Sequence, residues 1–455
     1  MVQKIQHKYN LELLSIHIPD KKTYILLIRA KGRKNKVKIT KGKNTRRKYY
    51  IVNLFCIFFL VLILLATYFI PKNNECVSIE KIATDDNKTR SFESSELKGV
   101  WIPFYTLDMK GTNYTEKEFK EKFETIASNC KNFGFTDIFV HVRSHGDAYY
   151  KSNYFPPSHF ITGKQGSPLN FDPLKIMVEI AHRYNLKFHA WINPYRIQLN
   201  NCPNYLSENN YFNIWKNSDK EIERDYVVDF GKEKYFNPGY SEVRSLIVKG
   251  IEEIVRNYDV DGIHFDDYFY PENKPDFDQK CYEDYLKSLN GNLQMPKEEW
   301  RATNVNSLIA NVYSAIKNIK PSVLLGISVC GNIMVNDRIS ADVRTWSQTP
   351  GYVDYICPEI YWNFEHPILP FDKGVNEWKN VVDRNFVKLY HGLGVYKAGS
   401  ERDNGTWKKS DNILQSEVEL ARKSGSDGFI LYAYEQLFDP KTQNEVTNVM
   451  KALNN

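Results

Sequence analysis

The sequence lacks the short motifs that commonly hold metal ions. It contains no Cys-x-x-Cys pair, no His-Glu-x-x-His motif and no calcium-loop pattern. Its seven cysteines follow no regular spacing, and Cys330 and Cys357 fall within apolar, strand-like segments. Free buried thiols are therefore expected in place of a disulfide scaffold. We predict that the chain uses no metal and no other cofactor.

Acidic residues are scarce at the start of the chain and in surplus after it. Residues 1–50 hold 15 of the 61 basic and two of the 55 acidic residues, which leaves 46 basic and 53 acidic residues, a net charge of −7, for the rest. Nucleic-acid binding draws its affinity from basic groups. We therefore expect no nucleic-acid partner, and the composition specifies no oligomeric state.

Charge is absent from residues 51–70, a run of twenty uncharged and mostly apolar residues. A helix of that length spans a bilayer core, at about 1.5 Å per residue. The basic run 31–48 directly precedes it, so the positive-inside rule keeps the N-terminus in the cytoplasm. A cleavable signal peptide fits less well, because no small-x-small cleavage site follows. We predict a basic cytoplasmic segment (1–50), a single-pass anchor in the cell membrane (51–70), a stalk (71–95) and an extracytoplasmic domain (96–455).

Beyond residue 96, strand-like and helix-like segments alternate along the chain. Eight segments have the composition and periodicity of strands: 100–104, 137–143, 187–193, 262–267, 324–330, 355–362, 388–395 and 428–434. Eight strand–helix units predict an α/β fold, a (β/α)₈ barrel of the TIM type. A doubly wound open sheet is the alternative.

Several predicted helices have clear start signals. Thr115 and Glu118 form the pattern of a capping box. Asp172 precedes a proline at the first helical position, and Asp439 repeats that arrangement before the last segment. Each of these signals predicts a helix that begins at the following residue.

The lengths of the connections differ between the two ends of the predicted strands. The segments that lead from strand to helix are long, as at 144–171, 194–239 and 268–297, whereas those from helix to strand are short. Extra chain therefore gathers at the C-terminal ends of the strands. In barrels of this kind that face holds the active site.

Polar side chains alternate with apolar ones on four of the predicted strands. Because successive strand residues point to opposite faces, an apolar outer face directs the polar residues into the barrel. The inward set contains His141, Arg143, Trp191, Asn193, His264, Asp266, Glu359 and Tyr361. A barrel lumen that served packing alone would hold Val, Ile and Leu at these positions.

Carboxylates mark the ends of two of these strands. Asp266 points inward where the fourth strand ends, and Asp267 beside it points sideways, which suits either a loop cap or a partner in chemistry. Glu359 is the other inward carboxylate, and Asp147 is a reserve that also suits an Asx turn. Two carboxyl groups across a lumen are the minimum for glycoside hydrolysis. We predict Asp266, Asp267 and Glu359 as catalytic residues.

Aromatic and basic residues gather at the same strand ends. Aromatic rings pack against the apolar faces of sugars, and arginines bind acidic or acylated sugars. Ion pairs between the arginines and acidic residues of the site are an equally good interpretation. The predicted substrate-binding residues are His141, Arg143, Asp147, Trp191, Asn193, Tyr195, Arg196, His264, Tyr268, Tyr361 and Trp362.

Six segments in order along the chain resemble bacterial proteins of glycosyl-hydrolase-like family 10. They are 98–102 (KGVWI), 146–150 (GDAYY), 191–196 (WINPYR), 235–239 (YFNPG), 261–268 (DGIHFDDY) and 354–362 (DYICPEIYW). The resemblance implies a (β/α)₈ barrel with glycosidase chemistry, and some members act on the glycan strands of peptidoglycan.

Two positions depart from related patterns. The frame 261–268 is also similar to the fourth strand of chitinase-type barrels, but Tyr268 stands where those enzymes have a glutamate acid. The family usually has glutamine at the position of Glu359, so the resemblance favours Asp266 or Asp267 over Glu359 as a catalytic residue.

The leading hypothesis is a membrane-anchored glycoside hydrolase that acts outside the cytoplasm on a cell-wall or related amino-sugar polysaccharide. Asp266 is the expected acid/base, with Asp267 or Glu359 as the second carboxylate. A barrel that binds glycan without cutting it is the alternative from another class. A lyase or transglycosylase that uses the same groups is a third reading.

Overall fold

The computed structural model describes residues 11–17, 24–30, 96–271, 274–289 and 293–455. The first unit contains a hairpin of two antiparallel strands, β1 (Leu11–His17) and β2 (Tyr24–Ala30), which the sequence analysis did not predict. The predicted anchor at 51–70 and stalk at 71–95 lie outside the described residues. Within the described ranges, no helix combines the length and the apolarity that a bilayer crossing requires.

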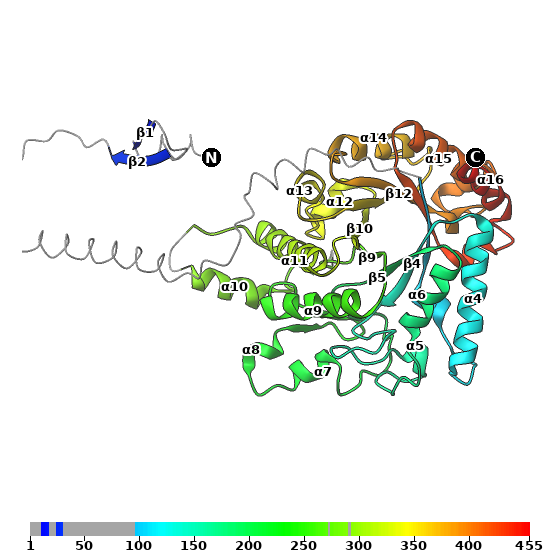
Figure 1. Cartoon of the computed structure of the whole chain (residues 1–455), viewed down its shortest axis with the longest axis horizontal. Helices are drawn as coiled ribbons and strands as arrows, with labels where there is room; N and C mark the ends of the chain where they lie inside the picture. The colour runs from blue at the N-terminus through cyan, green and yellow to red at the C-terminus, as the bar shows by residue number, and fades with distance from the viewer. Residues whose placement is uncertain (1–10, 18–23, 31–95, 272–273, 290–292) are drawn as a thin grey trace, which may run out of the picture. The chain divides into compact units, whose positions relative to one another are not determined.

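Eight parallel strands of the second unit close into a barrel (Figure 1). In order around the barrel they are β3 (Leu97–Ile102), β4 (Asp137–Arg143), β5 (Lys187–Ile192), β9 (Gly262–Phe265), β10 (Leu324–Cys330), β11 (Tyr355–Glu359), β12 (Lys388–Gly394) and β13 (Gly428–Tyr432). Every predicted strand segment overlaps one of them. The barrel prediction is therefore confirmed, and the open-sheet alternative is wrong because β13 pairs with β3 and leaves no edge.

Helices surround the strands (Figure 1). The longer ones are α4 (Glu116–Phe133), α6 (Pro173–Arg183), α9 (Ser241–Asn257), α10 (Gln279–Ser288), α11 (Lys297–Ile319), α14 (Phe371–Val381), α15 (Ile413–Lys423) and α16 (Gln443–Asn454). The shorter ones are α5 (His159–Thr162), α7 (Tyr211–Lys216), α8 (Glu221–Arg224), α12 (Ile333–Arg338) and α13 (Val343–Gln348). Each long helix except α10 buries several apolar residues on one side, as an amphipathic helix on a barrel does, whereas α10 buries Cys281 alone.

Buried apolar side chains fall into two separate clusters. The outer cluster, between strands and helices, takes Ile138 and Ile263 among many others. The inner cluster fills the barrel and contains Trp101, Phe139 and Tyr355. Neighbouring residues on one strand thus enter different clusters, which confirms the predicted period-two alternation.

Glycines make room for the large rings inside the barrel. A Cβ atom on Gly326 would lie 1.8 Å from the Tyr355 ring, and one on Gly262 would lie 2.2 Å from Nδ1 of His189. Both distances are shorter than atoms allow, so any larger residue would displace the ring on the neighbouring strand. The aromatic filling of the lumen therefore depends on these two glycines.

Two of the strands that end earlier than predicted carry the catalytic candidates. β9 ends at Phe265, so Asp266 and Asp267 occupy the first positions of the following loop. β11 ends at Glu359, because the chain turns there and the amide of Ile360 bonds back to the carbonyl of Pro358. The catalytic candidates consequently lie at the rim of the lumen.

The long connections lie on the C-terminal face of the barrel, as predicted. The segment after β5 forms a three-stranded sheet of β6 (Arg196–Gln198), β8 (Lys234–Phe236) and β7 (Val227–Asp229). The short helices α5, α7 and α8 lie on one side of the barrel in Figure 1. This added chain builds the walls around the strand ends.

Two of the three predicted helix starts are confirmed. Thr115 caps α4 in a capping box with Glu118, and Asp172 caps α6 before Pro173. The prediction at Asp439 is wrong: its side chain accepts from the amide of Lys441 in a turn, and α16 begins at Gln443. A short Asx turn there satisfies the carboxylate locally.

One carboxyl group outside the lumen is buried without a partner. Glu417 of α15 is 0% exposed, and neither of its oxygens has a hydrogen-bond partner. Its neighbour Glu445 is occupied, since it accepts from the amides of Ile413 and Leu414. Burial and the charge of Glu445 raise the pKa of Glu417 well above its usual range. Folding therefore favours the protonated form of Glu417.

We predict that Glu417→Gln stabilises the protein at alkaline pH. A pKa raised by folding contributes stability that is present below the unfolded pKa, about 4.3, and is lost as pH rises towards the folded pKa. Glutamine does not ionise, so the variant lacks this loss. The difference in free energy of unfolding between the variant and wild type should therefore grow by up to about 1.4 kcal/mol per pH unit between the unfolded and the folded pKa of Glu417. Chemical denaturation at pH 4 to 9 measures it. Glu419→Gln, at an exposed position on the same helix, is the control, and parallel curves for wild type and Glu417→Gln would contradict the assignment.

Candidate functional site

Three carboxyl groups meet at the C-terminal rim of the barrel. Asp266 and Asp267 follow β9, and Glu359 ends β11. The intervening strand β10 ends at Cys330, which pairs in register with Glu359 and donates its thiol to Oδ2 of Asp267 at 3.0 Å. Three adjacent strands thus bring together the three predicted catalytic residues.

Asp266 is the most enclosed of the three, at 2% exposure. Its oxygens accept the indole N–H of Trp191 at 3.2 Å and the amide N–H groups of Asn193 at 3.0 and 3.1 Å. Both donors come from the end of β5, the neighbouring strand. The carboxyl group therefore has a fixed orientation before any substrate arrives.

The donors to Asp266 are themselves held in place by arginine. Arg143 is 2% exposed and donates to the carbonyls of Asn193 and Pro194, both at 3.2 Å. Its guanidinium also lies 4.5 Å from the centre of the Phe155 ring. Through Nη2, Arg143 positions the backbone at Asn193, whereas its Nη1 has no hydrogen-bond partner. The predicted role of Arg143 in substrate binding stays a prediction.

Arg196 supplies positive charge to the carboxyl groups. Its Nε donates to the carbonyl of Ser144 at 2.8 Å, and its guanidinium lies 5.3 Å from the centre of the Tyr268 ring. Its positive charge lowers the pKa of both Asp266 and Asp267. Arg196 therefore acts electrostatically on the carboxyl cluster, and the charge of Arg143 also interacts with Asp266.

Burial dominates the protonation of the cluster. It raises the pKa of Asp266 to about 7, against the lowering effects of Arg196, Asn193 and Trp191. It also raises the pKa of Asp267, and burial together with the negative charge of Asp267 raises the pKa of Glu359 well above its usual range. The rim therefore retains protons at a pH at which exposed carboxyl groups have lost theirs.

Aromatic rings form a wall beside Glu359. Tyr361 packs against Tyr396 and Tyr432, with ring centres 5.8 and 5.6 Å apart. Tyr268 is 58% exposed at the rim. The sequence analysis missed Tyr396 and Tyr432; each lies at or just beyond the end of a predicted strand, and that position was the available signal.

Two predicted histidines are enclosed within the lumen. His264 is 0% exposed; Trp101 donates to its Nε2 at 3.1 Å, which leaves Nδ1 to donate to the hydroxyl of Tyr355 at 3.0 Å. His141 is 1% exposed and stacks on Trp191 at 3.8 Å between ring centres. Burial lowers the pKa of both histidines well below the usual range. This geometry supports a structural role for both histidines, in which neutral imidazoles hold the neighbouring tryptophan rings in place.

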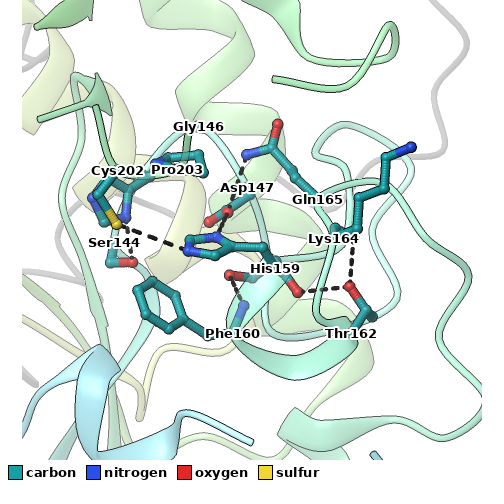
Figure 2. Close-up of polar contacts among 12 residues, drawn as sticks. Ser144, Gly146, Asp147, His159, Phe160, Thr162, Lys164, Gln165, Cys202 and Pro203 are labelled. Carbon is teal, nitrogen blue, oxygen red and sulfur yellow. Dashed lines mark hydrogen bonds and ion pairs between the residues drawn. The ribbon is translucent and has the colours of Figure 1, made fainter. Parts of the chain in front are cut away.

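Three other residues that were predicted to contact the ligand make contacts with residues outside the carboxyl cluster. Tyr195 is 1% exposed, packed in the outer apolar cluster. Trp362 packs on His366, with ring centres 5.2 Å apart. Asp147 is 0% exposed and accepts from Gln165, in a separate group of side chains (Figure 2). Its assignment as a substrate contact finds no support in this placement.

No metal centre is evident among the residues that the structure describes. Within those ranges, no group of three or more His, Cys, Asp and Glu side chains is arranged to hold an ion. The cysteines Cys130, Cys281 and Cys357 are free buried thiols, as predicted, whereas Cys202 is free but only partly buried. The thiol of Cys330 donates to Asp267.

Comparison with known proteins gives consistent matches. Residues 96–409 match the family described as glycosyl hydrolase-like 10. The chain is 36% identical to glycosyl hydrolase YngK of Bacillus subtilis (strain 168), over 72% of this chain and 67% of the relative. It is 28% identical to glycosyl hydrolase DigH of Escherichia coli (strain K12), over 79% of this chain and 88% of the relative.

A solved structure shares the barrel. The PgaB (BpsB) glycoside hydrolase domain from Bordetella bronchiseptica superposes with a TM-score of 0.50 at 12% identity, over 78% of this chain and 99% of that one. At this identity the similarity is one of fold alone.

We predict that Trp191→Phe raises the pKa of Asp266 above its wild-type value of about 7. The phenyl ring retains an aromatic face towards His141 but removes the N–H that stabilises the ionised carboxylate. Titration of ¹³C-labelled aspartate by NMR measures the shift. Trp362→Phe is the matched control and should leave the midpoint unchanged; an unchanged or lower midpoint in Trp191→Phe would contradict the assignment.

Proposed function

Because the chain belongs to the glycosyl hydrolase-like 10 family and is a glycoside hydrolase, we propose that it cleaves a cell-wall glycan of the peptidoglycan type or a related amino-sugar polysaccharide. Carboxylate acid/base catalysis is the proposed mechanism. The observation that carries it is the group of three carboxyl groups with raised pKa at one barrel rim.

Asp266 is the proposed acid/base. Glycoside hydrolysis requires one group that delivers a proton to the leaving oxygen and one ionised carboxylate that acts as base or nucleophile. A pKa of about 7 allows Asp266 to hold a proton and to release it near neutral pH. The hydrogen bonds from Trp191 and Asn193 keep its carboxyl group in one orientation through both states.

The second carboxyl group comes from Asp267 or Glu359. A negative charge on Asp267 raises the pKa of Glu359, so the two side chains resist simultaneous ionisation. If the pair retains one proton, the other carboxyl group is ionised and can act as the base or the nucleophile. Arg196 favours the ionised forms of both aspartates and thus favours the charge on the Asp267 side.

Sugar as the substrate is supported by the aromatic wall. Tyr361, Tyr396 and Tyr432 present tilted and edge-on rings beside Glu359, and Tyr268 is exposed at the rim. Such rings pack against the apolar faces of pyranoses. The guanidinium of Arg196 beneath Tyr268 suits an acidic or acylated substituent on the sugar.

We expect Asp266→Asn in the full-length protein to lower glycan cleavage by at least about 100-fold, the usual contribution of a general acid/base. The measurement is the appearance of new reducing ends from purified sacculi. Asp261→Asn is the matched control: Asp261 precedes the same strand at the opposite end of the barrel and bonds to His182 and the amide of Phe188. Full activity in Asp266→Asn would remove Asp266 from the mechanism.

The same assay separates the alternatives. A non-catalytic glycan-binding barrel would retain binding to sacculi and release no new ends, with or without Asp266. A lyase or transglycosylase would release products that lack the added water of hydrolysis, which mass spectrometry detects. Products that contain the added water, from wild type alone, support hydrolysis.

We also propose that residues 51–70 anchor the protein in the cell membrane with residues 96–455 outside the cytoplasm. The uncharged run of twenty residues behind a basic segment supports this topology. Deletion of residues 51–70 should move the protein from the carbonate-resistant membrane fraction to the supernatant. Wild-type protein that washes off with carbonate would contradict it.

A further inference from the structure

A second group of reactive side chains lies apart from the carboxyl cluster. Its members are Asp147 on the loop after β4, His159 at the start of α5 and Cys202 on the loop after β6 (Figure 2). Nε2 of His159 lies 3.8 Å from Sγ of Cys202, and Nδ1 of His159 lies 3.8 Å from Oδ2 of Asp147. The imidazole therefore lies between a thiol and a carboxylate.

The carboxylate in this group is buried and incompletely satisfied. Asp147 is 0% exposed; its Oδ2 accepts from Gln165 at 3.1 Å, and its Oδ1 has no hydrogen-bond partner. Nδ1 of His159 has no hydrogen-bond partner either. A buried carboxylate requires a nearby cation or donor. A protonated imidazole at His159 meets that requirement, with the positive charge of Arg143 as the other contribution.

The surroundings hold the imidazole in place. The ring of Phe160 packs on it with a centre-to-centre distance of 4.0 Å. Cys202 exchanges two backbone hydrogen bonds with Leu199, which fixes the tip of its loop. Both Cys202 and His159 are only partly buried, so small molecules in solution have access to them.

We propose that Cys202, His159 and Asp147 form a reactive-thiol site, distinct from the carboxyl cluster, that takes hydroperoxides and other soft electrophiles. His159 accepts the proton of the thiol and holds the thiolate as an ion pair, and the negative charge of Asp147 favours the protonated imidazole. The same division of roles activates nucleophiles in other proteins. The inference is independent of the glycan chemistry.

The reaction with a hydroperoxide balances within this group. The thiolate sulfur attacks one peroxide oxygen, the S–O bond forms and the O–O bond breaks. Sulfur loses two electrons and becomes a sulfenic acid, and the peroxide gains them. The departing alkoxide or hydroxide takes the proton from Nε2 of His159, which leaves the imidazole neutral.

The titratable groups around His159 favour the charged imidazole. Burial lowers the pKa of His159, but the adjacent Asp147 and Cys202 raise it to about 9. Burial lowers the pKa of nearby His145 well below its usual range, so His145 adds no charge of its own. Burial and the charge of Asp147 raise the pKa of nearby Tyr149 well above its usual range, so this phenol is also uncharged. Lys164 extends away from the imidazole (Figure 2).

Alkylation of the full-length protein by iodoacetamide tests the ion pair. In this reaction the S–C bond forms and iodide leaves. At pH 6, Cys202 should react at least about tenfold faster in wild type than in His159→Gln, because an unassisted thiol with a pKa near 8.5 is almost wholly protonated there. Peptide mapping by mass spectrometry gives the rate at each cysteine. Asp147→Asn should give an intermediate rate.

Cys330 is the internal control. It is also partly buried, but its thiol donates to the carboxylate Oδ2 of Asp267, which favours the protonated form. Its rate should be slow at pH 6 and unaffected by His159→Gln. Equal rates at Cys202 in wild type and His159→Gln, or no reaction at Cys202, would overturn the proposal.

A hydrogen peroxide pulse followed by dimedone tests the second half of the proposal. Wild type should gain one dimedone adduct at Cys202, and Cys202→Ser should gain none at this position. His159→Gln should gain it at least about tenfold more slowly, since the thiolate is the reacting form. Labelling that is faster at Cys330 than at Cys202 would overturn the assignment.

Discussion

The hydrogen bonds from Trp191 and Asn193 to Asp266 are the interaction on which the barrel rim depends. They place two donor groups, which make three hydrogen bonds, around a carboxyl group that is almost cut off from water. Burial alone would keep this acid protonated far above neutral pH, whereas the donors and the charge of Arg196 favour ionisation. The balance brings its pKa to about 7. Acid/base chemistry at neutral pH requires such a balance.

The rest of the rim maintains that arrangement. Arg143 holds the backbone at Asn193, and His141 supports the ring of Trp191 from the other side. Below them, His264 links Trp101 to Tyr355 across the lumen. Polar residues inside the barrel are therefore mostly supports for a few reacting groups. Their burial and low pKa fit neutral, well-packed roles.

The carboxyl cluster and the reactive-thiol site share two loops. Arg196, which acts on the aspartates, donates to the carbonyl of Ser144. The amide of Gly146 then bonds to the carbonyl of Ile197. Asp147 and Cys202 follow these residues on the same two loops. Long strand-to-helix connections on one face thus build two chemically different sites from adjacent segments of chain.

The order of elements and the direction of the strand residues follow from the sequence itself, because the 2-residue and 3.6-residue periods are local properties of the backbone. They were sufficient for the eight strands, for bringing Asp266 and Glu359 to the same rim, and for the barrel face that carries the long loops. Tertiary structure decided what each inward residue meets. Arg143 bonds to carbonyls of the neighbouring strand's loop, and Cys202 meets His159 across 43 positions of sequence. Such contacts form only when the barrel closes and its loops fold over the rim, and no local period encodes them.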